Sequence, residues 1–237
     1  MKKPLPSQPF LHTTPAAALT TTVDRLVTLD LPDHPGHRFQ ISCPTSIDEL
    51  LDHPATHEAF EADEYMPYWA ELWPAALMLG EAIAGHAWPP ATDVLEVGCG
   101  LGLSGIVALA LGLKVTFSDY DATALEFARR NAIANGYGGF HTLLLDWRYP
   151  PQDRQFSLVL GADVIYEARN IQPLLGLLDQ VLTTTGECWL ADPDRPHRQE
   201  FYQAAQQRGW HIEAAAKTLE RPGQTTVRGT VYRLRRL

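Results

Sequence analysis

Asp163 and Tyr166 are the residues whose types and surroundings most directly suggest chemistry. They follow the apolar stretch FSLVLGA, within the segment ADVIYE. A lone carboxylate in an apolar stretch is costly unless it is paired or exposed, so we place Asp163 at the carboxyl end of a buried strand, where it leaves the core. There Asp163 could accept a hydrogen bond from a nucleophilic amine, and the face of Tyr166 could stabilise a nearby cation. A structural cap on the loop after the strand is the alternative role for Asp163.

The glycine-rich segment VLEVGCGLGLSG is a second candidate site. A strand is expected to end at Gly98, and Gly100 and Gly102 let the backbone approach a ligand closely before a helix begins. The free N–H groups at the start of that helix favour an anionic or polar ligand group. Residues 100–105 also match the G-x-G-x-x-G pattern of dinucleotide-binding proteins, so this segment alone leaves NAD open.

Glu96 favours S-adenosylmethionine (SAM) over NAD as the ligand of this segment. It stands two residues before Gly98, where the strand of a nicotinamide-binding protein is usually apolar. A carboxylate there can anchor the cationic amino-acid end of SAM, directly or through water. The spacing Gly98-x-Gly100-x-Gly102 is also the spacing of SAM sites, while a purely structural glycine turn is the remaining alternative.

Polar and aromatic candidates also stand at the ends of the next two expected strands. Asp119, 21 residues after Gly98, is placed to bind both ribose hydroxyls. Asp146 can accept a hydrogen bond from an adenine amino group. Trp147 offers a stacking face, with a role as a core aromatic as its alternative. All of these residues follow strands, and open α/β sheets bind ligands at the carboxyl ends of their strands.

The elements that must position these residues are short apolar strands alternating with amphipathic helices. The expected strands include DVLEVG, KVTFSD, FHTLLLDW, FSLVLGAD and GECWLADP. This alternation predicts right-handed βαβ units and an α/β, doubly wound, mostly parallel sheet covered by helices on both faces. Two final strand-like segments without a helix between them, WHIEAAAK and TTVRGTVYRLRRL, predict an antiparallel hairpin at the sheet edge.

Three regions are expected along the chain. Residues 1–22 are rich in Pro, Thr and Ala and are predicted to be disordered. Residues 23–64 form an expected N-terminal extension, a hairpin followed by an acidic helix. From residue 46 to residue 64 there are seven acidic residues and no Lys or Arg. This stretch would suit a basic substrate, although a solvated helix face is the alternative.

Composition excludes several classes of protein. A net charge of −9 argues against nucleic acid as a partner, because phosphate binding needs a basic face. No apolar run approaches the roughly 20 residues of a membrane span. The three cysteines are scattered without metal-ligand spacing, which predicts a cytoplasmic protein with no metal site.

Several of these segments together resemble a known family: YWAELWP, LEVGCGLGLSGI, SDYD, LDW, LGADVIYE and ADPDRP. They resemble the class I, seven-β-strand SAM-dependent methyltransferases. More narrowly, they resemble the family of the lysine methyltransferases of the electron-transfer flavoprotein β-subunit and of valosin-containing protein. That family carries an Asp-x-x-Tyr motif after its fourth strand, matched here by Asp163 to Tyr166. The resemblance covers residues 65–237, which we therefore expect to form a Rossmann-like methyltransferase domain.

The resemblance also implies roles for single residues. Trp73 matches the tryptophan that packs on the methionine end of SAM, and Ala162 a backbone contact beside the adenosine. Further matches are the glycine-rich loop (Gly98, Cys99, Gly100), the ribose acid (Asp119) and the adenine-side aromatic (Trp147). SAM is then the expected cofactor, S-adenosylhomocysteine the product, and a protein lysine the expected acceptor. A small-molecule amine as acceptor and a non-catalytic SAM-binding module remain alternatives.

Overall fold

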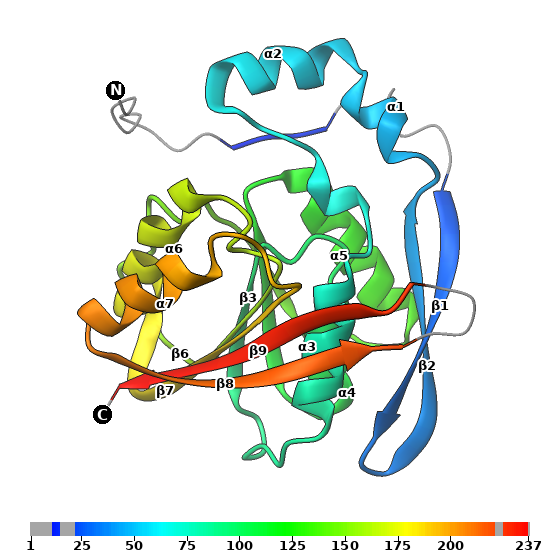
Figure 1. Ribbon diagram of the computed structural model, residues 1–237. Helices are drawn as coiled ribbons and strands as arrows, with labels where there is room; N and C mark the ends of the chain where they lie inside the picture. Colours follow the sequence, from blue (N-terminus) through cyan, green and yellow to red (C-terminus); the bar gives the residue numbers. More distant parts are fainter. Residues whose placement is uncertain (1–10, 15–21, 221–224, 237) are drawn as a thin grey trace.

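The computed structural model of the protein describes residues 11–14, 22–220 and 225–236 (Figure 1). The elements in chain order are β1 (Thr22–Leu31), β2 (His34–Pro44), α1 (Ile47–Leu51), α2 (Pro54–Asp63), the 3-10 helix η2 (Tyr68–Ala70), α3 (Pro74–Ala84), β3 (Asp93–Val97), α4 (Leu103–Ala110), β4 (Lys114–Asp119), α5 (Ala122–Ala134), β5 (His141–Leu144), β6 (Phe156–Ala162), α6 (Ala168–Val181), β7 (Leu182–Asp192), α7 (Arg198–Gln207), β8 (Trp210–Leu219) and β9 (Val227–Arg236).

The larger of the two sheets has seven strands in the order β5-β4-β3-β6-β7-β9-β8. Strands β3 to β7 pair in parallel, and β9 pairs antiparallel with both β7 and β8. The expected Rossmann-like sheet with a C-terminal antiparallel hairpin is therefore confirmed. The strand order reverses between β3 and β6, and the carboxyl ends of strands at such a reversal form the usual ligand crevice of open α/β sheets.

Alternation along the central strand β3 separates the core into two layers. Val94 belongs to the hydrophobic cluster formed with α3, α4 and α5, whereas Leu95 and Val97 belong to the cluster formed with α6 and α7. Helices accordingly lie on both faces of the sheet (Figure 1). Glu96, between Leu95 and Val97, faces the α4 side, because successive side chains of a strand point to opposite faces.

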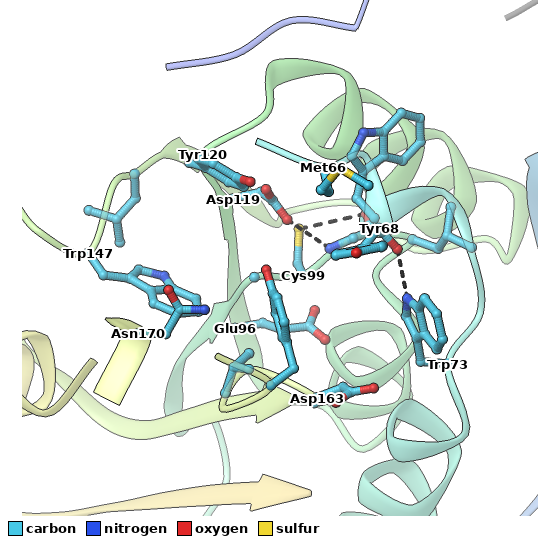
Figure 2. A pocket seen from close by; sticks show the side chains of 18 of the residues that line it. Met66, Tyr68, Trp73, Glu96, Cys99, Asp119, Tyr120, Trp147, Asp163 and Asn170 are labelled. Atoms are coloured by element: carbon cyan, nitrogen blue, oxygen red, sulfur yellow. Dashed lines mark hydrogen bonds between the residues drawn. The ribbon is translucent and has the colours of Figure 1, made fainter. Parts of the chain in front are cut away.

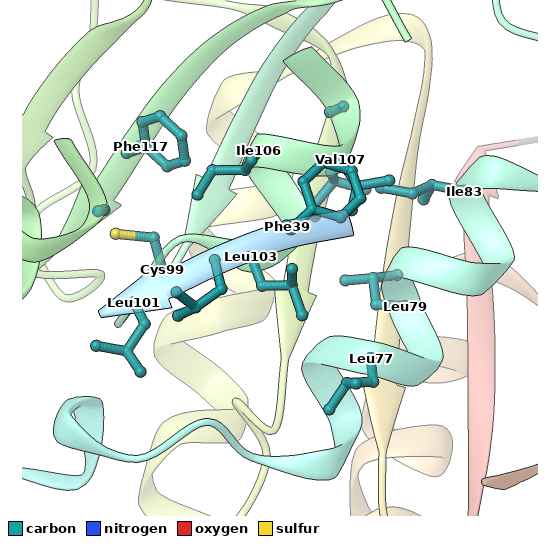
Figure 3. Close-up of a cluster of buried hydrophobic side chains, with 14 of the residues drawn as sticks. Phe39, Leu77, Leu79, Ile83, Cys99, Leu101, Leu103, Ile106, Val107 and Phe117 are labelled. Carbon is teal, nitrogen blue, oxygen red and sulfur yellow. The ribbon is translucent and has the colours of Figure 1, made fainter. Parts of the chain in front are cut away.

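The N-terminal hairpin shares the core of the rest of the protein. Phe39 and Ile41 of β2 are fully buried in the same cluster as Leu103 and Ile106 of α4 (Figure 3). Side chains of α5 also satisfy the backbone of β2: the Asn131 amide accepts a bond from the Ser42 N–H at 2.9 Å and donates to the Ser42 carbonyl at 3.1 Å. The hairpin is thus packed as an integral layer of the molecule.

The structure differs from expectation in two parts of the N-terminal region. Residues 1–10 and 15–21 of the predicted disordered segment lie outside the described residues. Residues 11–14, in contrast, contact the body of the protein, since Thr14 Oγ1 donates to Asp121 Oδ2 at 2.9 Å. The acidic segment forms two helices, α1 and α2, where one was expected. Pro54 is the cause, because proline lacks the N–H that would continue α1 but is well suited to the first turn of a new helix.

No helix in the described part of the chain is long and apolar enough to cross a membrane.

Candidate active site

A cavity of about 420 Å³ opens beyond the carboxyl ends of β3, β4 and β6 (Figure 2). This volume lies within the range of about 300–1,000 Å³ that is usual for small-molecule sites. All the site residues predicted from the sequence line it: Trp73, Glu96, Gly98, Cys99, Gly100, Gly102, Asp119, Asp146, Trp147, Ala162, Asp163 and Tyr166. The fold therefore brings together residues that are widely separated in the chain, and their individual roles stay predictions.

The glycine-rich loop after β3 forms the floor of the cavity. Gly98, Gly100 and Gly102 have φ angles of 58°, 50° and 84°, the left-handed region that favours glycine. A Cβ at Gly98 would lie 3.2 Å from the Trp147 ring, so the loop needs glycine for space as well as for conformation. Burial raises the pKa of the intervening Cys99 thiol, which keeps it protonated and a poor nucleophile.

Glu96 projects from β3 towards the first turn of α4. It is only 2% exposed, and its Oε2 accepts a hydrogen bond from the Gly105 N–H at 3.1 Å. Burial raises the pKa of Glu96 to about 8, because desolvation disfavours the charged form. A cationic ligand group beside this carboxyl would favour the ionised form, which makes Glu96 suited to a ligand ammonium.

Asp119 lies at the end of β4, next to the glycine-rich loop. Its carboxylate accepts hydrogen bonds from the Gly100 N–H at 3.0 Å and the Asp121 N–H at 3.1 Å. Burial raises the pKa of Asp119 to about 7. Each oxygen keeps a further lone pair, so hydroxyl groups of a ligand can still donate to it. Asp121 caps α5, accepting from the Thr123 N–H at 2.6 Å.

The Asp146 carboxylate, predicted to accept a hydrogen bond from adenine, is already bonded to an arginine of the protein. The guanidinium of Arg148 contacts both of its oxygens, with Nε–Oδ1 at 2.8 Å and Nη2–Oδ2 at 2.7 Å. The same guanidinium reaches Asp63 at the end of α2, with both N–O distances 2.8 Å. Two carboxylates thus raise the pKa of Arg148 and keep it charged. Sequence reasoning missed Arg148, and a partner 85 residues away leaves no local signal.

The N-terminal extension supplies one wall of the cavity through the end of α2. Arg169, at the start of α6, donates to Glu64 Oε2 at 2.6 Å and to the backbone carbonyls of Asp63 at 3.1 Å and Glu64 at 3.0 Å. Asp63, Glu64 and Arg169 all line the cavity. The extension, which the sequence resemblance does not cover, is therefore part of the candidate site.

Asp163 and aromatic side chains form the opposite end of the cavity. Asp163 has a φ of 55°, which turns the chain sharply as β6 ends, and its N–H donates to the Ala191 carbonyl at 2.8 Å. Tyr68 stands edge-on to both Tyr166 and Trp73, with ring centroids 5.7 and 6.2 Å apart. The Trp73 indole N–H donates to the Tyr68 carbonyl at 2.7 Å. Tyr68 was not predicted as a site residue, although it precedes Trp73 in the motif YWAELWP.

A neutral phenol and one ion pair lie at the end of the cavity that Asp163 and the aromatic rings form. Burial raises the pKa of Tyr166, so its phenol stays neutral at physiological pH. Arg195, which was likewise not predicted as a site residue, binds the Asp163 carboxylate through two hydrogen bonds. This end of the cavity therefore offers aromatic faces and one carboxylate to a ligand. In the described residues, no group of three or more His, Cys, Asp or Glu side chains is placed to hold a metal ion.

Proteins similar to this chain include methyltransferases named for histidine, arginine and lysine side chains. A histidine protein methyltransferase 1 homolog of Dictyostelium discoideum is 33% identical over 104 residues, covering 41% of this chain and 34% of the relative. The mouse histone-arginine methyltransferase METTL23 is 30% identical, covering 47% of each protein. Mouse EEF1A lysine methyltransferase 3 is 30% identical over 155 residues, covering 62% of this chain and 66% of the relative. The chain thus spans about a third to two thirds of the length of these relatives.

Solved structures support the fold. A TehB-like SAM-dependent methyltransferase from Corynebacterium glutamicum superposes with a TM-score of 0.53 and 16% identity, covering 76% of this chain and 94% of that one.

The family match includes most of the cavity. The model of a family described as lysine methyltransferase matches residues 62–208, more than half of the chain. That range begins at the end of α2 and extends through β3 to α7, so it contains every predicted site residue. By this match, the chain belongs to the lysine methyltransferase family.

Proposed function

We propose that this protein is a SAM-dependent N-methyltransferase that methylates lysine side chains of a protein substrate. The main support is a continuous cavity at the carboxyl edge of the sheet, which joins a glycine-rich loop and buried acids to an end formed by aromatic rings and a carboxylate. A nucleotide-like ligand suits the first part and an amine suits the second. A reaction between two such ligands requires this adjacency.

The residues around the glycine-rich loop fit SAM. A Cβ at Gly98 or Gly100 would be tightly placed, at 3.2 Å from its nearest neighbour. Asp119 can accept from ribose hydroxyls, and the Trp147 ring lies beside Gly98. Glu96 can pair with the ammonium of the amino-acid end. SAM, when bound, supplies an activated methyl group. The task left to the protein is orientation, which can contribute about 7–11 kcal/mol to catalysis.

The aromatic end fits a lysine amine. A free lysine has a pKa of about 10.4, so only about one in two thousand is neutral at pH 7. The aromatic rings of Tyr68, Trp73 and Tyr166 remove water from the amine, and desolvation favours its neutral form. Asp163 can accept a hydrogen bond from the amine and so direct its lone pair. Tyr166 serves as a neutral phenol and an aromatic face.

The surface of α2 fits a basic protein substrate. Asp63 and Glu64 are paired with arginines, whereas Glu58 and Glu61 are exposed acids on the same helix. Lysine-rich segments carry the complementary charge, and such complementarity chiefly speeds association. We expect the reaction in the cytoplasm, where unpaired cysteines are maintained.

The cofactor is tested by calorimetry with SAM, S-adenosylhomocysteine and NAD. Binding of the first two and not of NAD is the expected result. Ligand at 100 times its dissociation constant should also add about 2.7 kcal/mol to stability. Preferential binding of NAD would refute the assignment.

The acceptor is tested by incubating the protein with labelled SAM and a cell lysate, followed by acid hydrolysis of the labelled protein. Label in methyllysine supports the proposal, while label in methylhistidine, methylarginine or a small molecule would assign a different acceptor. The Asp163→Ala variant should lose transfer and keep its SAM affinity within a few-fold. Tight SAM binding without any transfer would identify a non-catalytic SAM-binding module.

A further inference from the structure

We propose that Arg195 is a positioning residue that holds the Asp163 carboxylate in one orientation, so that Asp163 orients the acceptor amine. This inference rests on the proposed function and assigns the task of a residue outside the cavity. Arg195 is absent from the residues that line the cavity, whereas Asp163 is among them.

The contact between Arg195 and Asp163 is a two-point clamp. Arg195 Nε donates to Asp163 Oδ1 at 2.9 Å, and Arg195 Nη2 donates to Asp163 Oδ2 at 2.7 Å. Such parallel bonds fix the plane of a carboxylate as well as its position. The side chain of Asp163 is 5% exposed and that of Arg195 is 35% exposed, so the guanidinium reaches Asp163 from the outer side.

Arg195 is itself held in place from two directions. Its backbone N–H donates to Oδ1 of the fully buried Asp192 at 2.7 Å. Its guanidinium lies over the Trp73 ring, 5.6 Å from the centroid. The hydrogen bonds to Asp163 also raise the pKa of Arg195, which remains a cation at every working pH. A fixed cation therefore lies against the cavity carboxylate, and its backbone is anchored to a buried acid.

This arrangement defines what Asp163 can do. The clamp uses one lone pair on each carboxylate oxygen and leaves another on each for an N–H donor. Asp163 can therefore accept a hydrogen bond from an amine and aim its lone pair. The clamp thus gives Asp163 the role of a fixed hydrogen-bond acceptor.

The preference of the site for an amine can be measured without an acceptor protein, by comparing two ligands. The probe is sinefungin, a SAM analogue that carries an amine in place of the methylated sulfonium, and the reference ligand is S-adenosylhomocysteine. Calorimetry gives both dissociation constants for the wild type and for the variants Arg195→Gln, Arg195→Lys and Asp163→Asn. The matched control is Arg198→Gln, which removes a neighbouring arginine that pairs with Asp194 at 2.6 Å.

Wild type should bind sinefungin more tightly than S-adenosylhomocysteine. Arg195→Gln and Asp163→Asn should each reduce that preference at least about fivefold, as expected for loss of a charge-assisted hydrogen bond. Arg195→Lys keeps the charge without the two-point geometry, so its preference for sinefungin should lie between those of the wild type and Arg195→Gln. The affinity for S-adenosylhomocysteine should stay within about threefold throughout, because Arg195 does not line the cavity. Arg198→Gln should resemble the wild type.

A double-mutant cycle separates positioning from a general structural role. If Arg195 acts through Asp163, Arg195→Gln should have little further effect on the preference in the Asp163→Asn background. Independent, additive losses would overturn the inference, as would an unchanged preference in both Arg195→Gln and Arg195→Lys. If the wild type binds both nucleosides equally, the orienting role of Asp163 is wrong. If it binds neither, the proposed function itself fails and the inference with it.

Discussion

Replacing Glu96 with glutamine should make the protein without ligand more stable at alkaline pH. Glutamine preserves the shape of the side chain and an oxygen that can accept the Gly105 N–H, but it removes the buried charge. In the folded protein the Glu96 carboxyl holds its proton more tightly than in the unfolded chain. Stability of the wild type should therefore fall as the pH rises from about 4.5 to about 8, and the variant should lack this contribution.

The size of the effect follows from the change in pKa. A rise from 4.5 to about 8 corresponds, at about 1.36 kcal/mol per pH unit, to roughly 5 kcal/mol. Relaxation around the ionised carboxylate would reduce this value, so a gain of roughly 2–5 kcal/mol at pH 9 is expected for Glu96→Gln. Asp119, whose pKa rises to about 7, adds a pH dependence of its own to both proteins, and its charge also helps to raise the pKa of Glu96.

Urea unfolding of both proteins at several pH values between 4.5 and 9 measures this difference. The gap in unfolding free energy should widen with pH and level off above about 8. Glu81→Gln, at an exposed carboxyl on α3, is the control and should show no such widening. A gap that stays constant across the range would refute the reasoning. SAM affinity should fall in Glu96→Gln, since the proposed partner of the ligand ammonium has lost its charge.

Four further predictions concern the same site, its supports and helix α6. SAM binding at pH 7 should release protons, because a cation beside Glu96 lowers its pKa from about 8; calorimetry in buffers of different ionisation enthalpy measures this, and proton uptake would contradict it. Gly105→Ala should destabilise by about 1–3 kcal/mol, because its Cβ would lie 2.4 Å from Phe117 Cε1 and 2.6 Å from Glu96 Oε2. Gly176→Ala in α6, where a Cβ meets nothing within 4 Å, should instead stabilise by about 0.5–1 kcal/mol, and denaturant titration compares the two. Arg148→Gln should weaken SAM binding and lower the melting temperature, because Arg148 pairs with Asp63 and Asp146. The control is Arg129→Gln, whose arginine pairs with Glu126 on the exposed face of α5, and it should have smaller effects. Equal effects would mean that the ion pairs of Arg148 do not support the site.

The sequence alone determined the sheet and the edge at which the site lies. Apolar residues recur with different spacings in strands and in helices, so the alternation of strands and helices can be predicted from the sequence without tertiary information. Parallel strands bring their carboxyl ends to one edge, so acids and glycines that follow strands could be placed together in advance. Glu96, Asp119 and Asp163 are examples, since each position follows from its place in or just after a strand.

Only the tertiary structure decided which partners these side chains meet and how deeply they are buried. Arg195 clamps Asp163 from 32 residues away, and Arg148 binds Asp63 from 85 residues away. No local pattern encodes such pairs, because they depend on how α2, β7 and the loops pack. The pKa of Glu96 likewise depends on desolvation by neighbours from α4 and β4, and burial is a property of the packed molecule.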